Sequence, residues 1–130
     1  MRFALLVCLL LMGISPSAAN YINGHMLAEW CQDKQTPLIQ GYVTGVVDRT
    51  EAVMAFIDTF KAFRPQLDAK DAAVLSEGTE LFCVPARATV ARLSEIVCQR
   101  LQRNPADRNL PAQTVVTRAL QQAYPCPAGR

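Results

Sequence analysis

Four cysteines behind an apolar N-terminal stretch constrain this chain more than any other feature. The 130 residues include five cysteines, and the first of them, Cys8, lies within the apolar stretch itself. An even number of cysteines in a small exported protein is typical of a modest hydrophobic core that disulfides reinforce. We therefore expect a compact domain outside the cytosol, of the kind that acts by binding. Its four cysteines are Cys31, Cys83, Cys98 and Cys126.

The N-terminus has the pattern of a cleavable export signal. A positively charged start precedes an almost wholly apolar run over residues 3–14, and Ser17-Ala18-Ala19 supplies the small residues that a signal peptidase recognises. A membrane anchor is the alternative, but a membrane-spanning helix needs about 20 apolar residues and this run stops at Pro16. The sequence therefore predicts removal of residues 1–19 and a soluble single domain over residues 20–130.

Apolar residues recur at three- and four-residue spacing along most of the remaining chain, which is typical of helices. Asn23 can cap a first helix, and Pro37 suits the first turn of a long second helix that Pro65 ends. The predicted fold class is an all-α bundle of about four helices cross-linked by two disulfides. The first helix is expected to end near Cys31. The second runs from Pro37 to about Arg64 with a bend near Asp48-Arg49-Thr50, and a helical turn follows at 72–75. The third runs from about Thr89 to Arg103, and the fourth from Leu110-Pro111 to Pro125.

Two glycines four residues apart, Gly41 and Gly45, lie inside the second expected helix. Each costs about 1 kcal/mol relative to alanine in a helix interior, so we expect the close approach of another helix to offset that cost. A phosphate-binding loop is the alternative, but no Lys-Ser/Thr pair follows and no strand precedes. The predicted core consists of Trp30, Tyr42, Val46, Phe56, Phe60, Leu93, Val97, Val116 and Leu120.

The residues that could support catalysis are few. His25 is the only histidine, so a Cys–His pair could involve no other. The carboxylates are scattered and form no convincing acid–base pair, and no CxxC-like spacing is present to begin a zinc site. The sequence therefore predicts a protein that is not an enzyme and that uses no metal or cofactor.

The second half of the chain is moderately cationic, although the net charge of +2 implies no general affinity for nucleic acid or membranes. One interpretation is that the basic residues form the solvated polar faces of two helices. The other is a patch that meets an acidic partner and speeds encounter. The residues concerned are Arg87, Arg92, Arg100, Arg103, Arg108 and Arg118.

Several short motifs occur in a fixed order over nearly all of residues 24–126. They are Trp30-Cys31, the run from Gly41 to Asp48, Phe82-Cys83-Val84-Pro85 before a helix, Asn104-Pro105, and a terminal run from Ala119 to Cys126. No single motif is specific, but the ordered set resembles the Rap/Tai family, the periplasmic immunity proteins of type VI secretion. The resemblance implies a helical, often dimeric protein in the periplasm. It also implies that the protein binds a peptidoglycan amidase, a toxin delivered by sister cells, and blocks its active-site cleft.

One departure from the family concerns the cysteines. Family members commonly have a cysteine just before the Gly-Tyr pair, able to bond with the one at the Cys31 position, and Ile39-Gln40 occupies that place here. Four cysteines allow three pairings. We favour Cys31–Cys98 together with Cys83–Cys126, which would join the segment before the third helix to the end of the fourth.

Two polar segments are candidates for contact with the amidase, because a protruding segment of fixed shape limits the ordering cost of binding. Arg64 to Asp71 follows the long helix, and Asn104 to Asn109 forms a tight turn with Asp107 and Arg108 at its tip. We favour the second because two helices brace it, and an ordinary solvated connection is the alternative for both. The polar residues concerned are Arg64, Gln66, Asp68, Lys70 and Asp71 in the first segment and Asn104, Asp107, Arg108 and Asn109 in the second, with Arg92, Glu95 and Gln99 on the third helix next in order.

A periplasmic acid-stress chaperone is the alternative function. Such proteins are also small, exported, helical and held by a disulfide, and they bind unfolding clients after acid loosens their dimers. They tend to be rich in charged residues, whereas only 18% of this chain is charged and it lacks an acidic cluster. The composition therefore favours the immunity protein.

Overall fold

The computed structural model describes residues 21–63 and 81–127. Three predictions fall outside these residues: the export signal over 1–19, the segment from Arg64 to Asp71, and the helical turn at 72–75. Within the described ranges the fold is all-α, as predicted, with four α-helices, one short 3-10 helix and no β-strand. No helix in these ranges has the length and hydrophobicity that a membrane crossing requires.

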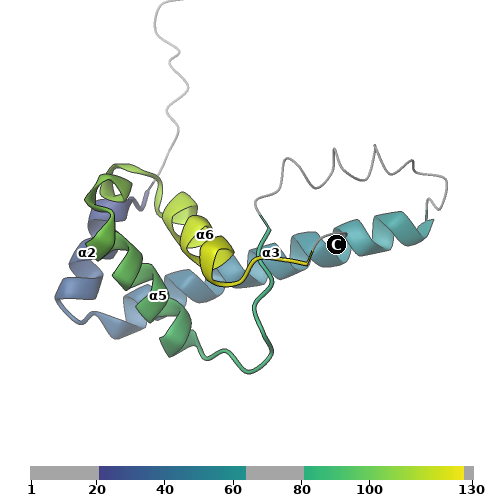
Figure 1. The fold of residues 1–130 in the computed structure, drawn as a ribbon, viewed down its shortest axis with the longest axis horizontal. Coiled ribbons are helices and arrows are strands. Elements are labelled where there is room, and N and C mark those ends of the chain that lie inside the picture. The colour runs from purple at the N-terminus through teal and green to yellow at the C-terminus, as the bar shows by residue number, and fades with distance from the viewer. Residues whose placement is uncertain (1–20, 64–80, 128–130) are drawn as a thin grey trace, which may run out of the picture.

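The four helices occupy the regions that the periodicity predicts. Helix α3 runs through Asp48-Arg49-Thr50 without interruption, and the expected tight turn after α5 is a 3-10 helix, η1. The helices are α2 (Gly24–Gln32), α3 (Thr36–Phe63), α5 (Val90–Arg103), η1 (Pro105–Asn109) and α6 (Ala112–Ala123) (Figure 1).

Side chains at the helix starts satisfy backbone donors that would otherwise lack partners. The Asn23 Oδ1 accepts a hydrogen bond from the Met26 N–H at 3.1 Å, and the Thr89 Oγ1 accepts one from the Arg92 N–H at 3.3 Å. Pro111, which has no N–H to leave unpaired, occupies the cap position of α6. The predicted helix starts are thus confirmed.

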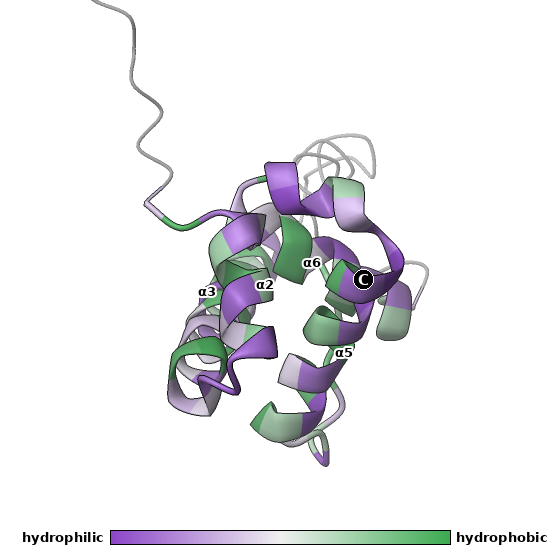
Figure 2. Cartoon of the chain, turned by 90° about the vertical axis from the view of Figure 1, so that its left-hand side faces the viewer, coloured by the Kyte–Doolittle hydropathy of each residue, from purple (hydrophilic) through white to green (hydrophobic). Residues whose placement is uncertain are grey.

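The core lies where α2, α5 and α6 pack against the N-terminal half of α3. The C-terminal half of α3 extends beyond the other three helices (Figure 1). Viewed end-on to α3, a hydrophobic part of α6 lies centrally, with α2 and α3 on one side and α5 on the other (Figure 2). The largest fully buried side chains are Phe82, Leu27, Leu101, Leu120, Val43, Val97, Val115 and Val116.

The aromatic part of the predicted core is largely wrong. Trp30, Tyr42 and Phe60 are only partly buried, and Phe56 is 65% exposed. Phe56 stacks on Phe60 with 6.1 Å between ring centroids, in the half of α3 that the other helices leave uncovered. The aliphatic part is confirmed, because Val46, Leu93, Val97, Val116 and Leu120 are all buried.

Both favoured disulfides are confirmed. Cys31–Cys98 joins α2 to α5 across 67 residues, and Cys83–Cys126 joins the segment before α5 to the segment after α6 across 43 residues. Each bond therefore connects parts of the bundle that lie far apart in sequence.

The prediction that Gly41 and Gly45 lie against another helix is wrong. Both are exposed, and a Cβ atom built at either would have no contact within 4 Å. The glycine that does allow a close approach is Gly24, at the first turn of α2. A Cβ atom there would come 2.7 Å from the Cα of Arg108 and 2.9 Å from its carbonyl oxygen.

Gly24→Ala is expected to lower the free energy of unfolding by about 1–3 kcal/mol, because backbone atoms of η1 leave no room for a methyl group. Urea denaturation of the purified protein measures this change. Gln102→Ala, at an exposed position of α5, is the matched control and should change stability by less than about 0.5 kcal/mol. An unchanged Gly24→Ala variant would contradict the packing.

Candidate partner interface

The segment from Asn104 to Asn109 has a shape fixed by the surrounding helices. Residues 105–109 form η1, and the segment before α2 pairs with the chain that follows η1. The Gly24 N–H donates to the Leu110 carbonyl at 2.9 Å, and the Ala112 N–H donates to the Ile22 carbonyl at 3.1 Å. The segment therefore contacts α2 as well as α5 and α6.

The sequence suggested that Asp107 lies at an exposed tip, but its side chain is buried on the inner side of η1. Its Oδ2 accepts a hydrogen bond from the Arg100 Nε at 2.6 Å, and the two side chains are only 11% and 18% exposed. A second nitrogen of Arg100, Nη1, donates to the Gln122 Oε1 at 3.1 Å. An unpaired carboxylate would be costly at this depth. Asp107 can be buried because Arg100, on the other side of the end of α5, neutralises its charge.

Arg108 is also partly withdrawn from the surface. Its Nε is buried and has no hydrogen-bond partner among the described residues. Asn109 is exposed, and its Oδ1 lies 3.2 Å from the Nε2 of His25 on α2. The residues of this segment that a partner could reach are therefore Asn104, Pro105, Ala106 and Asn109.

The other predicted contact residues divide into two groups. Arg64, Gln66, Asp68, Lys70 and Asp71 lie outside the described residues, so a role for them stays a prediction. Arg92, Glu95 and Gln99 are joined along one face of α5. The Arg92 Nη1 is 2.6 Å from the Glu95 Oε2, and the Gln99 Nε2 donates to the Glu95 Oε1 at 3.0 Å.

A groove of about 380 Å³ runs between α5 and α6 and ends at Asn104, next to η1. Three arginines line it, Arg92, Arg100 and Arg103, and no aspartate or glutamate among the described residues does so. The hydrogen bond and charge of Glu95 raise the pKa of Arg92, so its guanidinium stays protonated. The groove therefore adjoins the exposed face of η1, and its arginines give it a positive charge and hydrogen-bond donors.

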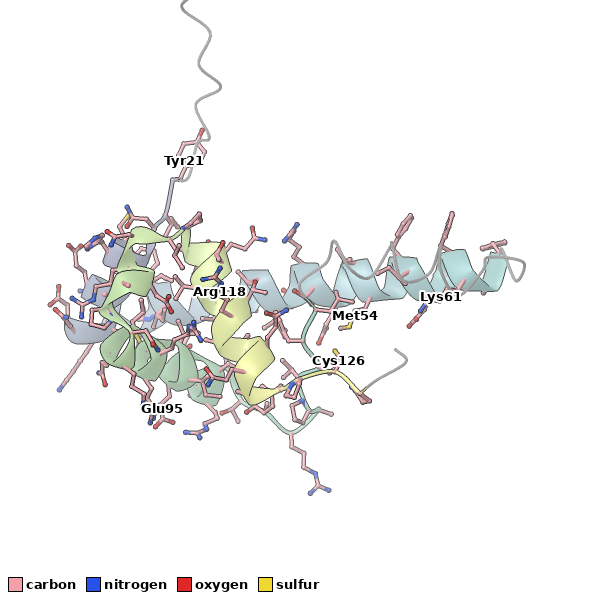
Figure 3. The ribbon with its side chains drawn as sticks, turned by 45° about the horizontal axis from the view of Figure 1, so that its top comes forward. Tyr21, Met54, Lys61, Glu95, Arg118 and Cys126 are labelled. Carbon is pink, nitrogen blue, oxygen red and sulfur yellow. A yellow bond between two sulfur atoms is a disulfide. The ribbon has the colours of Figure 1, made fainter. Side chains whose placement is uncertain are left out.

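A second cavity, of about 230 Å³, lies beside the C-terminal half of α3. Met54 and Lys61 project from α3 toward the side where Cys126 lies (Figure 3). Among the described residues, the carboxylates in its lining are those of Glu51 and Asp58, and no histidine lies beside them. These described residues form no acid–base or nucleophilic arrangement.

The described residues hold no recognisable catalytic or metal-binding set. No three of their His, Cys, Asp and Glu side chains come together as metal ligands. All four of their cysteines are bonded in disulfides, so none is a free thiol that could pair with His25.

Sequence reasoning missed two features of this surface. One is the Arg100–Asp107 pair, whose members lie seven residues apart across the end of α5. The signal that could have found it is the opposite charge of the two residues on either side of the helix-ending Asn104-Pro105. The other is the groove, which needs the relative placement of α5 and α6.

The family of Rap1a immunity proteins matches residues 23–126, which include every helix of the described structure. No curated protein matches the chain, and no solved structure matches it. The matched region contains both disulfides, η1 and the groove between α5 and α6. Because the match covers most of the sequence, the chain belongs to the Rap1a immunity proteins.

Proposed function

We propose that this protein protects its producer by binding a type VI secreted peptidoglycan amidase in the periplasm and blocking the active-site cleft. The observation that carries the proposal is the family match over residues 23–126, which supports an immunity protein for a secreted effector. An immunity protein acts as a non-catalytic inhibitor and needs a cognate effector as its partner. The proposal adds to the family assignment that the effector is an amidase and that the two proteins meet in the periplasm.

The cysteines and the N-terminal sequence support the periplasm. The chain carries two disulfides, which persist in oxidising compartments and are rare in the cytosol. Residues 1–19 have the pattern of a cleavable export signal. A peptidoglycan amidase acts in the same compartment, so inhibitor and toxin would meet there.

The fixed shape of η1 supports insertion into a cleft. Contacts from α2, α5 and α6 hold this segment, so little conformational entropy would be lost on binding. Its reachable residues are Asn104, Pro105, Ala106 and Asn109. We propose this face as the central contact, with Asp107 and Arg108 holding its shape from within.

A homodimer is also part of the proposal. Phe56 and Phe63, seven residues apart on α3, are 65% and 82% exposed, and Leu38 on the same helix is 48% exposed. Large apolar side chains gathered on one exposed face are typical of protein–protein contacts. We propose that this face of α3 packs against a second copy of the chain.

The test begins with the genes next to its own: if one of them encodes a peptidoglycan amidase, that amidase is purified and titrated with this protein. Hydrolysis of peptidoglycan is expected to fall stoichiometrically at neutral pH, and light scattering on the same samples should give the mass of a dimer. Lysozyme, which cuts the glycan strand instead, is the control and should keep its activity. Undiminished amidase activity, with protection of varied client proteins only in strong acid, would instead support a chaperone.

A further inference from the structure

We infer that the groove between α5 and α6 binds an acidic segment of the effector, so that charge as well as shape determines the partner. The inference rests on the proposed function, because it requires that the protein binds an effector. It goes beyond that function by naming a second contact surface and the chemistry of what fills it.

The positive charge of the groove is only partly neutralised. Glu95 pairs with Arg92 and Asp107 pairs with Arg100, but Arg103 forms no ion pair within the described residues. Arg103 is exposed and lies at the end of the groove next to Asn104 and η1. A carboxylate from a partner would therefore meet an unpaired guanidinium beside the face proposed to enter the cleft.

The paired arginines retain donors as well. A guanidinium carries five N–H donors, and Glu95 contacts Arg92 through one nitrogen. Tyr124, which also lines the groove, interacts with Arg92 as well. The Arg92 side chain is 54% exposed, so a donor that Glu95 and Tyr124 leave free can contact a carboxylate. Exposed pairs of this kind contribute little to stability, which leaves Arg92 available for binding at small cost.

The groove is also held in shape before any partner arrives. Arg100 is fixed by Asp107 and Gln122, and Gln99 is fixed by Glu95. Ile96, Ala119 and Ala123 provide an apolar part of the lining. This combination fits an extended peptide segment that has acidic side chains and some apolar surface. The low net charge of the whole chain argues against a nucleic acid as the occupant.

Arg103→Glu combined with Arg92→Glu tests the inference, with Arg87→Glu as the matched control. Arg87 is exposed, forms no ion pair among the described residues, and lies outside the groove lining. The probes are the amidase identified by the test of the proposed function and, separately, an oligoglutamate peptide with oligoglutamine as its uncharged counterpart. Surface plasmon resonance measures both, and melting curves check that each variant is folded.

The double variant is expected to bind the amidase about 10- to 100-fold more weakly at low salt, with a smaller difference at high salt. Arg87→Glu should change the affinity less than about threefold, since a lone charge outside the interface has little effect. Oligoglutamate should bind the wild type better than oligoglutamine does, and the double variant should lose this preference.

The outcomes separate the two proposals. Undiminished binding of the double variant to the amidase would overturn the acidic-segment inference while leaving the proposed function in place. Charge-dependent peptide binding without any amidase binding would support the groove and contradict the proposed effector. If the double substitution instead abolished self-association, the groove would be an interface between copies and the inference would be overturned.

Discussion

Removing the Cys31–Cys98 disulfide is expected to lower the free energy of unfolding by about 4 kcal/mol. In the chain-entropy model the loss grows with the loop that the bond closes, and this bond spans 67 residues. Domains of this size are stable by only about 5–15 kcal/mol, so a large part of the total depends on one cross-link. The variant is Cys31→Ala with Cys98→Ala, and its urea denaturation curve measures the change.

The second disulfide and a reductant supply the controls for this experiment. Removing Cys83–Cys126, which spans 43 residues, should cost nearly as much, again about 4 kcal/mol. Dithiothreitol should destabilise the wild type and leave a variant without all four cysteines unchanged. A Cys31→Ala/Cys98→Ala protein that unfolds at the wild-type urea concentration would show that packing, rather than the cross-link, holds α2 to α5.

The effect also bears on the compartment in which the protein can act. A copy retained in the reducing cytosol would lack both cross-links and lose stability from each. Under the proposed function, the folded form would therefore accumulate after export rather than in the cytosol. The dependence on disulfides follows from the small size of the domain, whose core is limited by the surface it must keep exposed.

Local sequence signals predicted the helices well, because each acts over a few residues. Asn23 and Thr89 cap the helices that they were expected to begin, and the stripe of Leu93 and Val97 is buried as the spacing indicates. The favoured pairing of the cysteines is also confirmed, although the sequence alone left three pairings open. The helix predictions needed little knowledge of how the helices are arranged.

The errors arose because the buried face of α3 is narrower than its apolar pattern suggests. Its buried residues form one stripe that continues into the C-terminal half: Ile39, Val43, Val46, Thr50 and Ile57. Phe56 and the two glycines lie on another side of the same helix, and all three are exposed. Periodicity indicates that a helix has a buried face, but it does not show how wide that face is.

The local structure of the candidate contact segment was predicted only in part. The turn after α5 is braced as expected, but its acidic residue points inward because Arg100 lies within reach across the helix end. Sequence alone gives the two charges without their depth. It therefore assigned Asp107 to partner contact, where the structure assigns it a role in holding η1.

Replacing Asp107 by alanine is expected to lower the free energy of unfolding by about 3 kcal/mol, at the low end of the range for breaking a buried ion pair. The loss arises mainly because Arg100 would keep its charge while losing its carboxylate partner. Arg100 retains Gln122 and some contact with solvent, which limits the cost. Thermal and urea denaturation of Asp107→Ala measure the effect.

Two further variants separate this structural role from binding. Asp107→Leu combined with Arg100→Leu removes both charges, so it should cost less than Asp107→Ala alone. Ala106→Tyr instead places a bulky side chain on the exposed face of η1, where it should change stability by less than about 0.5 kcal/mol. That variant should inhibit the amidase poorly while it remains folded. Full inhibition by Ala106→Tyr would exclude η1 from the cleft and leave the groove between α5 and α6 as the contact to test.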